Sequence, residues 1–261
     1  MIDDEVNAEN NRNRFKKGVY LLPNLITSAS LFGGFYSIIA SLDGDFEKAA
    51  IAIFISAILD GLDGRIARLT GSTSKFGVEY DSLADLIAFG LAPGVLIFTW
   101  GLRPFGRYGW LAAFLYVVCG ALRLARFNVQ ITTIESKRFN GLPIPAAAVL
   151  VAMTVLMFFH LGRGEEMVKH ITVLALVYFL AYLMISNVKY YSFKELHPGI
   201  RSPFRLLVGI IVLFIIVAAQ PTVMLFALIL GYVFSGPVTT YFDRKKRLAM
   251  SNGASVGNEK N

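Results

Sequence analysis

Apolar residues fill most of this chain in long runs, separated by short segments rich in Gly, Pro and charged residues. Two runs near the C-terminus, 206–219 and 223–234, show no alternation of apolar and polar positions. Such runs are typical of helices that cross a membrane, whereas an outer-membrane barrel gives alternating segments of about ten residues. The pattern predicts an all-α fold, a polytopic membrane helix bundle.

Breaking the sequence at Gly, Pro and charge clusters gives about eight transmembrane helices. Their predicted ranges are 20–41, 47–69, 83–101, 109–129, 143–161, 170–188, 203–219 and 222–241. The residues before Tyr20 contain no apolar core, so we expect the first run to remain as a helix and not to be a cleaved signal peptide.

The composition supports this assignment and excludes other classes. Of the 261 residues, 55% are hydrophobic and 16% charged, which does not suit a soluble or disordered chain. The single cysteine, Cys119, excludes an intramolecular disulfide. In a chain this apolar, we expect the net charge of +7 to set topology and to meet anionic lipid headgroups, with no nucleic-acid partner.

The distribution of basic residues predicts the orientation in the membrane. With both termini inside, 20 of the 25 Lys and Arg residues lie in inner segments. The five outer ones are Lys48, Arg103, Arg107, Arg163 and Lys169. Because Lys and Arg concentrate on the cytoplasmic side, we expect both termini to face the cytoplasm in the cell membrane.

This topology divides the chain into a cytoplasmic N-terminal segment (1–19), a transmembrane domain (20–241) and a cytoplasmic tail (242–261). The longer inner loops, around 70–82 and 127–142 among others, hold most of the polar residues available for chemistry. We therefore expect the functional site to face the cytoplasm.

Four aspartates, Asp60, Asp63, Asp81 and Asp85, lie near the ends of two consecutive predicted helices. Each pair is three or four residues apart and so lies on one helical face, and the short connection brings the two pairs together. Four like charges at a membrane edge repel one another unless a cation compensates them. The spacing therefore predicts a metal site, where a single aspartate would more often be a helix cap.

Carboxylate ligands without a nearby histidine or cysteine favour Mg²⁺ or Mn²⁺, with Ca²⁺ as an alternative. Four carboxylates can hold two ions, the arrangement that stabilises the attacking and leaving oxygens in phosphoryl transfer. Gly64 and Gly77 each cost a helix about 1 kcal/mol relative to alanine, which points to close approach of a bulky group such as a nucleotide. Arg68 is a candidate phosphate partner, or only a topology-setting charge.

This segment resembles the signature of the CDP-alcohol phosphotransferase family, D-x2-D-G-x2-A-R-x8-G-x3-D-x3-D. All eight fixed positions are matched, by Asp60, Asp63, Gly64, Ala67, Arg68, Gly77, Asp81 and Asp85. The resemblance implies the fold of that family. It also implies an integral-membrane enzyme, usually a homodimer, that transfers a phosphatidyl group from CDP-diacylglycerol to an alcohol and releases CMP.

The resemblance further implies roles for individual residues. Asp60, Asp63 and Asp81 would bind metal, and Asp85 would complete the metal site and act as the catalytic base toward the attacking hydroxyl. The residues implied to contact the CDP-lipid are Asn24, Thr27, Gly64, Ala67, Arg68, Ser74 and Gly77.

Three stretches outside the signature look like the phosphatidylserine synthase branch of the family: R-L-A-R-F-N from Arg123, F-N-G-L-P-I-P-A-A-A from Phe139 and I-S-N-V-K-Y from Ile185. A pocket for L-serine needs a fixed guanidinium to bind the carboxylate. Arg123 and Arg126 lie on one helical face and can supply it, with Asn128 as a neutral hydrogen-bond partner. Alternatively, both arginines only set the topology.

The expected function is transfer of the phosphatidyl group of CDP-diacylglycerol to L-serine by direct displacement, since no residue resembles a covalent nucleophile. The alternatives are another acceptor, such as inositol phosphate or glycerol phosphate, and an archaeal lipid donor. A phosphorylated acceptor would need further arginines. A divalent-cation transporter is more distant, because the outer halves of two helices, 50–57 and 89–97, contain no acidic residue.

Overall fold

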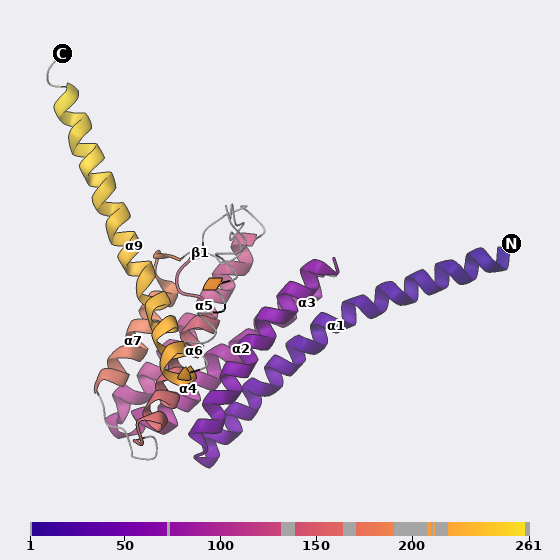
Figure 1. The fold of residues 1–261 in the computed structure, drawn as a ribbon, viewed down its shortest axis with the longest axis horizontal. Helices are drawn as coiled ribbons and strands as arrows, with labels where there is room; N and C mark the ends of the chain where they lie inside the picture. The colour runs from indigo at the N-terminus through magenta and orange to yellow at the C-terminus, as the bar shows by residue number, and fades with distance from the viewer. Residues whose placement is uncertain are drawn as a thin grey trace.

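The computed structural model describes residues 2–71, 74–131, 139–163, 171–190, 208–209, 211 and 219–258. Within these residues the chain is a bundle of long helices with one short pair of strands (Figure 1). Seven of the eight predicted helices coincide with helical segments. The remaining one, 203–219, lies almost entirely outside the described residues.

The first part of the bundle consists of α1 (Ile2–Asp43), α2 (Phe46–Leu69) and a composite third helix. The composite helix comprises α3 (Lys75–Asp85), the π-helix η1 (Leu86–Leu91), α4 (Ala92–Ile97), the π-helix η2 (Phe98–Leu102) and the 3₁₀ turn η3 (Arg103–Phe105). The later elements are α5 (Arg107–Ile131), β1 (Phe139–Asn140), α6 (Ile144–His160), α7 (Ile171–Ile185), β2 (Lys189–Tyr190) and α9 (Pro221–Asn258).

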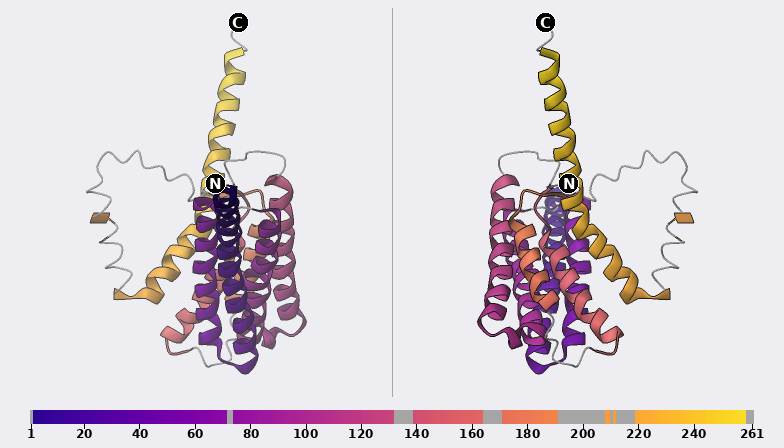
Figure 2. Two further views of the ribbon diagram at one scale, coloured as in Figure 1. Left: turned by 90° about the vertical axis from the view of Figure 1, so that its right-hand side faces the viewer. Right: turned by 90° about the vertical axis from the view of Figure 1, so that its left-hand side faces the viewer.

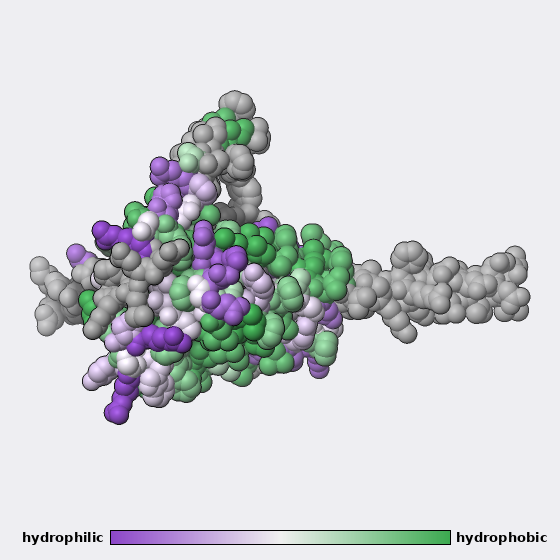
Figure 3. Space-filling model, turned by 90° about the horizontal axis from the view of Figure 1, so that it is seen from below, coloured by the Kyte–Doolittle hydropathy of each residue, from purple (hydrophilic) through white to green (hydrophobic). Residues whose placement is uncertain are grey.

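The described helices suit a lipid environment. Four stretches are long and apolar enough to cross a membrane: Leu22–Asp43, Lys75–Phe105, Arg107–Val129 and Pro221–Thr240. Helices α6 and α7 are shorter and also apolar. Hydrophobic residues cover much of the face drawn in Figure 3, with hydrophilic residues in patches among them. The protein is therefore an all-helical membrane bundle, and the exact number of spans stays a prediction.

The end of α9 projects beyond one end of the bundle, and the N-terminus of α1 lies toward the same end (Figures 1 and 2). The tight turn between α1 and α2 is at the opposite end, so the α2–α3 connection lies toward the end that both termini approach. The signature segment therefore lies toward the same end of the bundle as the two termini.

Small residues let α1 pack closely on its neighbours. Ser30 and Ser56 donate their hydroxyls to each other's backbone carbonyls, at 3.0 Å in both directions, which ties α1 to α2. A Cβ atom on Gly34 would come within 2.5 Å of Ala88 Cα, so only glycine allows α1 to approach η1 this closely. These contacts hold α1 against α2, which carries the first part of the signature, and against η1, which directly follows its last residue.

The third helix begins earlier than predicted, at Lys75 and not near residue 83. Ser74 caps this helix, because its hydroxyl accepts a hydrogen bond from the backbone N–H of Gly77 at 3.0 Å. The loop expected up to residue 82 is therefore short, and Asp81 lies on a helix.

The π-helical segment η1 has an identifiable support. Pro93 has no backbone N–H, so the carbonyl of Phe89, four residues earlier, lacks its helical donor. The buried Tyr116 on α5 donates its hydroxyl to this carbonyl at 3.1 Å. A side chain from a neighbouring helix thus supplies a hydrogen-bond donor to the Phe89 carbonyl, just after the signature.

The later helices are tied together near the same end of the bundle. Gly141 adopts φ +86°, and its N–H donates to the carbonyl of Val188 at 2.8 Å. Strands β1 and β2 pair antiparallel, with Phe139 opposite Tyr190. Helix α6 starts at Ile144, directly after Pro143, so the chain enters it from a non-helical segment.

Candidate active site

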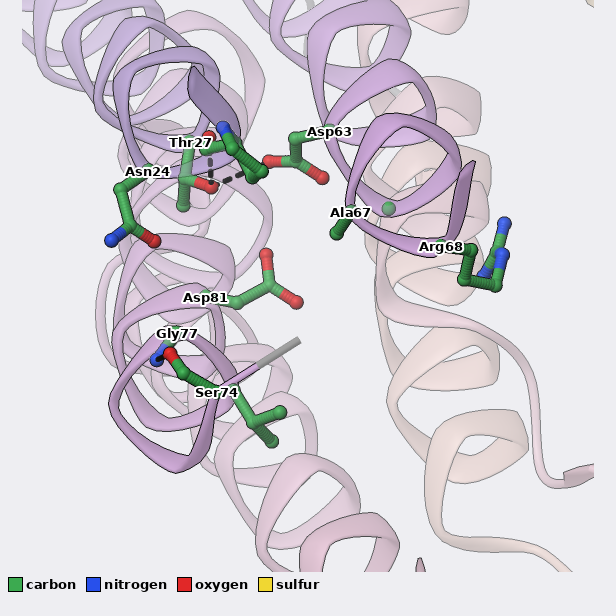
Figure 4. A pocket seen from close by; sticks show the side chains of 11 residues that line it. Asn24, Thr27, Asp63, Ala67, Arg68, Ser74, Gly77 and Asp81 are labelled. Carbon is green, nitrogen blue, oxygen red and sulfur yellow. Dashed lines mark hydrogen bonds between the residues drawn. The ribbon is translucent and has the colours of Figure 1, made fainter. Parts of the chain in front are cut away.

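A pocket of about 170 Å³ lies where α1, α2 and α3 meet (Figure 4). Its lining residues are Pro23, Asn24, Thr27, Asp63, Gly64, Ala67, Arg68, Ser74, Gly77, Val78 and Asp81. The structure therefore brings together all seven residues that the family resemblance assigns to the CDP-lipid, with two of the four aspartates.

The acidic residues of α2 and α3 converge at this pocket. Ligand oxygens of Asp60, Asp63 and Asp81 all lie within 4.8 Å of one another. Figure 4 shows the carboxyl groups of Asp63 and Asp81 directed toward a common space between the two helices. Asp85, one turn beyond Asp81, lies close enough to the other three carboxyl groups for their charges to interact. The four aspartates therefore form one cluster, as their spacing predicts.

The cluster has the properties of a cation site. Asp63 is only 4% exposed, and Oδ1 of Asp81 is buried without a hydrogen-bond partner in the described part of the chain. Among the same residues, no Lys or Arg forms an ion pair with any of the four carboxylates. Buried carboxylates that form no ion pair are costly, so these residues fit a divalent ion.

Thr27 has a second role beside lining the pocket. Its buried hydroxyl donates to Oδ2 of Asp63 at 2.7 Å, across the interface between α1 and α2. A carboxylate oriented in this way presents its other oxygen to the cluster. Thr27 therefore connects the first helix to the acidic residues, a contact that the sequence did not reveal.

The glycines leave open backbone beside the cluster. A Cβ atom on Gly64 would meet only the Arg68 guanidinium, at 3.9 Å, so the surface there is unobstructed and the Arg68 side chain lies near it. A Cβ atom on Gly77 would come within 3.1 Å of the Ser74 hydroxyl. Because Gly64, Gly77 and Ala67 have small side chains or none, this surface of the pocket is open to a planar group.

The three residues predicted to bind serine lie on α5, outside this pocket, and they differ from one another. Arg126 donates from Nη2 to Oδ1 of Asn187 at 2.8 Å, and Asn128 donates to the Ser82 hydroxyl at 3.0 Å. Arg123 has a buried Nε–H without a partner among the described residues, and its charge lies within electrostatic range of Asp85. The structure thus separates two arginines that look equivalent in the sequence.

Tyr80 also borders this region, and sequence reasoning did not identify it. Its hydroxyl lies 2.8 Å from that of Ser28 on α1, and its ring stacks on Phe76 with centroids 5.9 Å apart. Tyr80 occupies a variable position of the signature, directly before Asp81. Its contact with Ser28, which joins α3 to α1 beside the pocket, is the feature that identifies Tyr80.

Comparison with known proteins gives consistent results. The family model for CDP-alcohol phosphatidyltransferase matches residues 20–182. A CDP-diacylglycerol-serine O-phosphatidyltransferase from Helicobacter pylori is 42% identical over 201 residues, covering 76% of this chain and 83% of that protein. An archaetidylserine synthase from Methanothermobacter thermautotrophicus is 39% identical over 171 residues, 65% of this chain and 69% of that protein.

A relative from Saccharomyces cerevisiae, also named CDP-diacylglycerol-serine O-phosphatidyltransferase, is 38% identical over 144 residues, 50% of this chain and 51% of that protein. The matched region contains every residue of the acidic cluster and of the adjoining pocket. With the complete signature and the helical bundle that presents it, these matches show that the chain belongs to the CDP-alcohol phosphatidyltransferase family.

Proposed function

We propose that this protein transfers the phosphatidyl group of CDP-diacylglycerol to the hydroxyl of L-serine, giving phosphatidylserine and CMP. The observation that carries the proposal is the convergence of four aspartates from α2 and α3 beside a pocket walled by glycines. Relatives in bacteria and yeast that are named for this reaction support serine as the acceptor.

The cytidine diphosphate part of the donor would occupy the pocket between α1 and α3. Gly64 and Gly77 leave room for the nucleotide beside Ala67. Arg68 and Ser74 would contact the diphosphate, and Asn24 and Thr27 would contact the donor from α1. The exposed apolar side chains of Leu69 and Phe76 flank this region and suit a position next to the acyl chains.

Asp60, Asp63, Asp81 and Asp85 would hold the metal, as two Mg²⁺ or Mn²⁺ ions. When bound, such ions polarise the phosphate under attack and stabilise the charge on the departing CMP. Asp85 would accept the proton of the serine hydroxyl. A bond then forms between the serine oxygen and the lipid-side phosphorus while the bond from that phosphorus to the CMP oxygen breaks.

Arg123 is the better candidate for the serine carboxylate, because Arg126 is already bonded to Asn187. The charge of Arg123 lies within electrostatic range of Asp85, so a bound serine would have its carboxylate near the guanidinium and its hydroxyl near the base. Asn128 is bonded to Ser82 and would act as a neutral support between α5 and α3.

The other candidate functions have less support. A phosphorylated acceptor would need several arginines near the base, whereas in the described residues Arg126 is directed to Asn187. A cation transporter would need a polar route, but the helices beyond the cluster pack into a core that includes the fully buried Ile53, Phe89 and Leu96. An archaeal lipid donor stays open, because the archaetidylserine synthase is 39% identical to this chain.

The test of this proposal is release of CMP by the purified protein in detergent. CDP-diacylglycerol and Mn²⁺ or Mg²⁺ are supplied with serine, inositol phosphate or glycerol phosphate, and CDP-archaeol replaces the donor in a parallel series. We expect serine-dependent CMP release and a phosphatidylserine product. A preference for a phosphorylated alcohol would refute serine as the acceptor without affecting the family assignment.

We further propose a homodimer in the cell membrane with the active site and both termini in the cytoplasm, and the domain limits 1–19, 20–241 and 242–261. Cysteine labelling tests the orientation, since the one native cysteine, Cys119, is buried. An impermeant thiol reagent applied to intact cells should label Arg163→Cys and should not label Thr70→Cys, both exposed positions. Inverted vesicles should give the opposite result, and labelling of Thr70→Cys in intact cells would reverse the topology.

A further inference from the structure

The pocket between α1, α2 and α3, called the donor pocket from here on, has two facing walls close to each other. One wall is a single turn of α1, residues 23–27, and the other is the first part of α3, residues 77–81 (Figure 4). A Cβ atom on Gly77 would lie 3.5 Å from Oδ1 of Asn24, across the gap. A bond that fixes α1 relative to α3 therefore helps to set the width of the donor pocket.

Ser28 and Tyr80 form such a bond. The Ser28 hydroxyl donates to the backbone carbonyl of Asn24 at 2.7 Å, and its oxygen lies 2.8 Å from the hydroxyl oxygen of Tyr80 on α3. A hydroxyl has one proton, and that of Ser28 is given to Asn24, so the Tyr80 phenol is the donor to Ser28. Hydrogen bonds thus run from α3 through two side chains to the backbone of a residue that lines the pocket.

The ring of Tyr80 is held in place from its other side. It stacks on the ring of Phe76, with centroids 5.9 Å apart and planes 8° from parallel. Phe76 lies about one turn earlier on α3 and is 70% exposed, whereas Tyr80 is half-buried. The stacking restricts rotation of the Tyr80 ring, so that its hydroxyl stays directed to Ser28.

A separate contact ties α1 to α2. Thr27, next to Ser28, donates to Oδ2 of Asp63 at 2.7 Å. Neighbouring residues of α1 therefore bond to the two other helices of the donor pocket, Thr27 to the acidic cluster on α2 and Ser28 to α3. Loss of the Ser28–Tyr80 bond would leave the α1–α2 contact in place and free α1 only with respect to α3.

We propose that Tyr80 is a positioning residue for the donor pocket. Its bond to Ser28 holds the α1 turn that carries Asn24 at the distance from α3 that fits the nucleotide part of the CDP-lipid. Tyr80 is not among the residues that line the pocket, so it acts through Ser28 and Asn24 and not by contact with the donor. This inference rests on the proposed function and adds a residue at a variable position of the signature.

The experiment uses the purified full-length protein and the variants Tyr80→Phe, Ser28→Ala and their double variant. CMP release is measured at varied CDP-diacylglycerol and at varied serine. Each single variant should raise the KM for CDP-diacylglycerol about 2- to 12-fold, the effect of one neutral hydrogen bond. The inhibition constant of CMP, which shares the nucleotide, should rise by a similar factor. The kcat and the KM for serine should stay near those of the wild type, because weaker donor binding alone changes only the donor KM.

Two matched controls separate this bond from general effects of the substitutions. Ser41→Ala removes the same kind of local bond far from the pocket on α1, since Ser41 donates to the carbonyl of Ser37 at 2.7 Å. Tyr182→Phe removes the hydroxyl of a tyrosine on α7 that is 64% exposed. Neither control should change the KM for CDP-diacylglycerol. The double variant should be no worse than the single ones, because both remove the same bond.

Three results would overturn this inference. The first is an unchanged KM for CDP-diacylglycerol in Tyr80→Phe, and the proposed function would stand if Gly64→Ala raised that KM. The second is an additive loss in the double variant, which would show that the two residues act separately. The third is an equal rise of both KM values with a lower melting temperature, which would make Tyr80 merely structural. A wild-type protein that releases no CMP from CDP-diacylglycerol with any of the alcohols would instead refute the proposed function.

Discussion

The two sides of the active site are built in different ways. The donor side takes its acidic residues from one segment of 26 residues, Asp60 to Asp85, and α1 covers that segment. The proposed acceptor side combines Arg123 and Arg126 on α5 with Asn187 after α7, which is bonded to Arg126. On the proposed assignment, the residues for the metal and the donor come from one local segment and α1, whereas those for the alcohol depend on contacts between distant parts of the chain.

This difference has a physical basis. Metal ligands must be placed within a few ångströms of one another, and helical spacing across one tight connection achieves this with few interactions. A pocket for an interchangeable alcohol tolerates greater variation, so its residues can come from several helices whose packing is adjusted separately. Mutations on the donor side should therefore abolish the reaction, and those on the acceptor side should mainly change affinity for the alcohol.

The largest effect is expected at the acidic cluster. Asp81→Asn removes a charged oxygen ligand and should reduce turnover by about 100-fold or more, since single electrostatic groups of an active site contribute at this level. Asp45→Asn is the matched control, because Asp45 is exposed and paired only with Lys48 among the described residues.

Both variants are assayed for CMP release at saturating Mg²⁺, and their melting temperatures are measured with and without Mn²⁺. Mn²⁺ should stabilise the wild type and Asp45→Asn more than Asp81→Asn, because a ligand stabilises the state that binds it. If Asp81→Asn kept more than about a tenth of wild-type turnover, Asp81 would not be a metal ligand, because losing a ligand should cost far more.

The next effect separates the two arginines. Arg123→Lys should raise the KM for serine by about 10- to 150-fold, because a lysine does not reproduce a bidentate contact with a carboxylate and a charged hydrogen bond is worth about 1.5–3 kcal/mol. Arg126→Lys, whose guanidinium is bonded to Asn187, should change this KM much less. Steady-state kinetics at varied serine give the comparison, and equal effects of the two variants would show that the acceptor pocket is assigned wrongly.

Much of the donor side could be predicted from the sequence. Helix ranges followed from long apolar runs, and Asp60, Asp63, Asp81 and Asp85 from helical periodicity. The start of the third helix was placed too late, because Lys75, Glu79 and Asp81 interrupt the apolar run and the first turn is marked by the Ser74 cap. The π-helical turn η1 was also missed, because the partner of its Phe89 carbonyl is Tyr116, 27 residues away in the sequence.

The acceptor side could be predicted only in part. Arg123 and Arg126 lie three residues apart on one helix, so no local pattern distinguishes them. Their difference comes from Asn187, which is 61 residues from Arg126 in the sequence. The contact of α9 with Tyr190 gave no local signal either, because the Tyr190 hydroxyl bonds the carbonyl of Val233, 43 residues further along the chain.

A moderate effect is expected from a pair of glycines on α2. Gly64→Ala should raise the KM for CDP-diacylglycerol about tenfold, since one added methyl group in a fitted pocket typically costs at least this much. The fold should tolerate it, because the new Cβ would meet only Arg68, at 3.9 Å. Gly61→Ala, where nothing lies within 4 Å, is the control. Both variants should unfold at or above the wild-type temperature. An unchanged KM for CDP-diacylglycerol in Gly64→Ala would show that the nucleotide does not bind beside Gly64.

The smallest effect on catalysis is expected from a second pair of glycines, on α9. Gly236→Ala places a Cβ atom in the Tyr190 ring and should destabilise the protein by about 1–3 kcal/mol, the usual cost of overpacking. Gly231→Ala meets no atom within 4 Å and should leave stability unchanged or increase it by up to about 1 kcal/mol.

If α9 forms part of the acceptor pocket, Gly236→Ala should also raise the KM for serine, by less than Arg123→Lys does. The KM for CDP-diacylglycerol should not change. Thermal unfolding and kinetics of the two variants test both points, and equal loss of affinity for both substrates would mean that α9 supports the whole bundle and not the acceptor side alone.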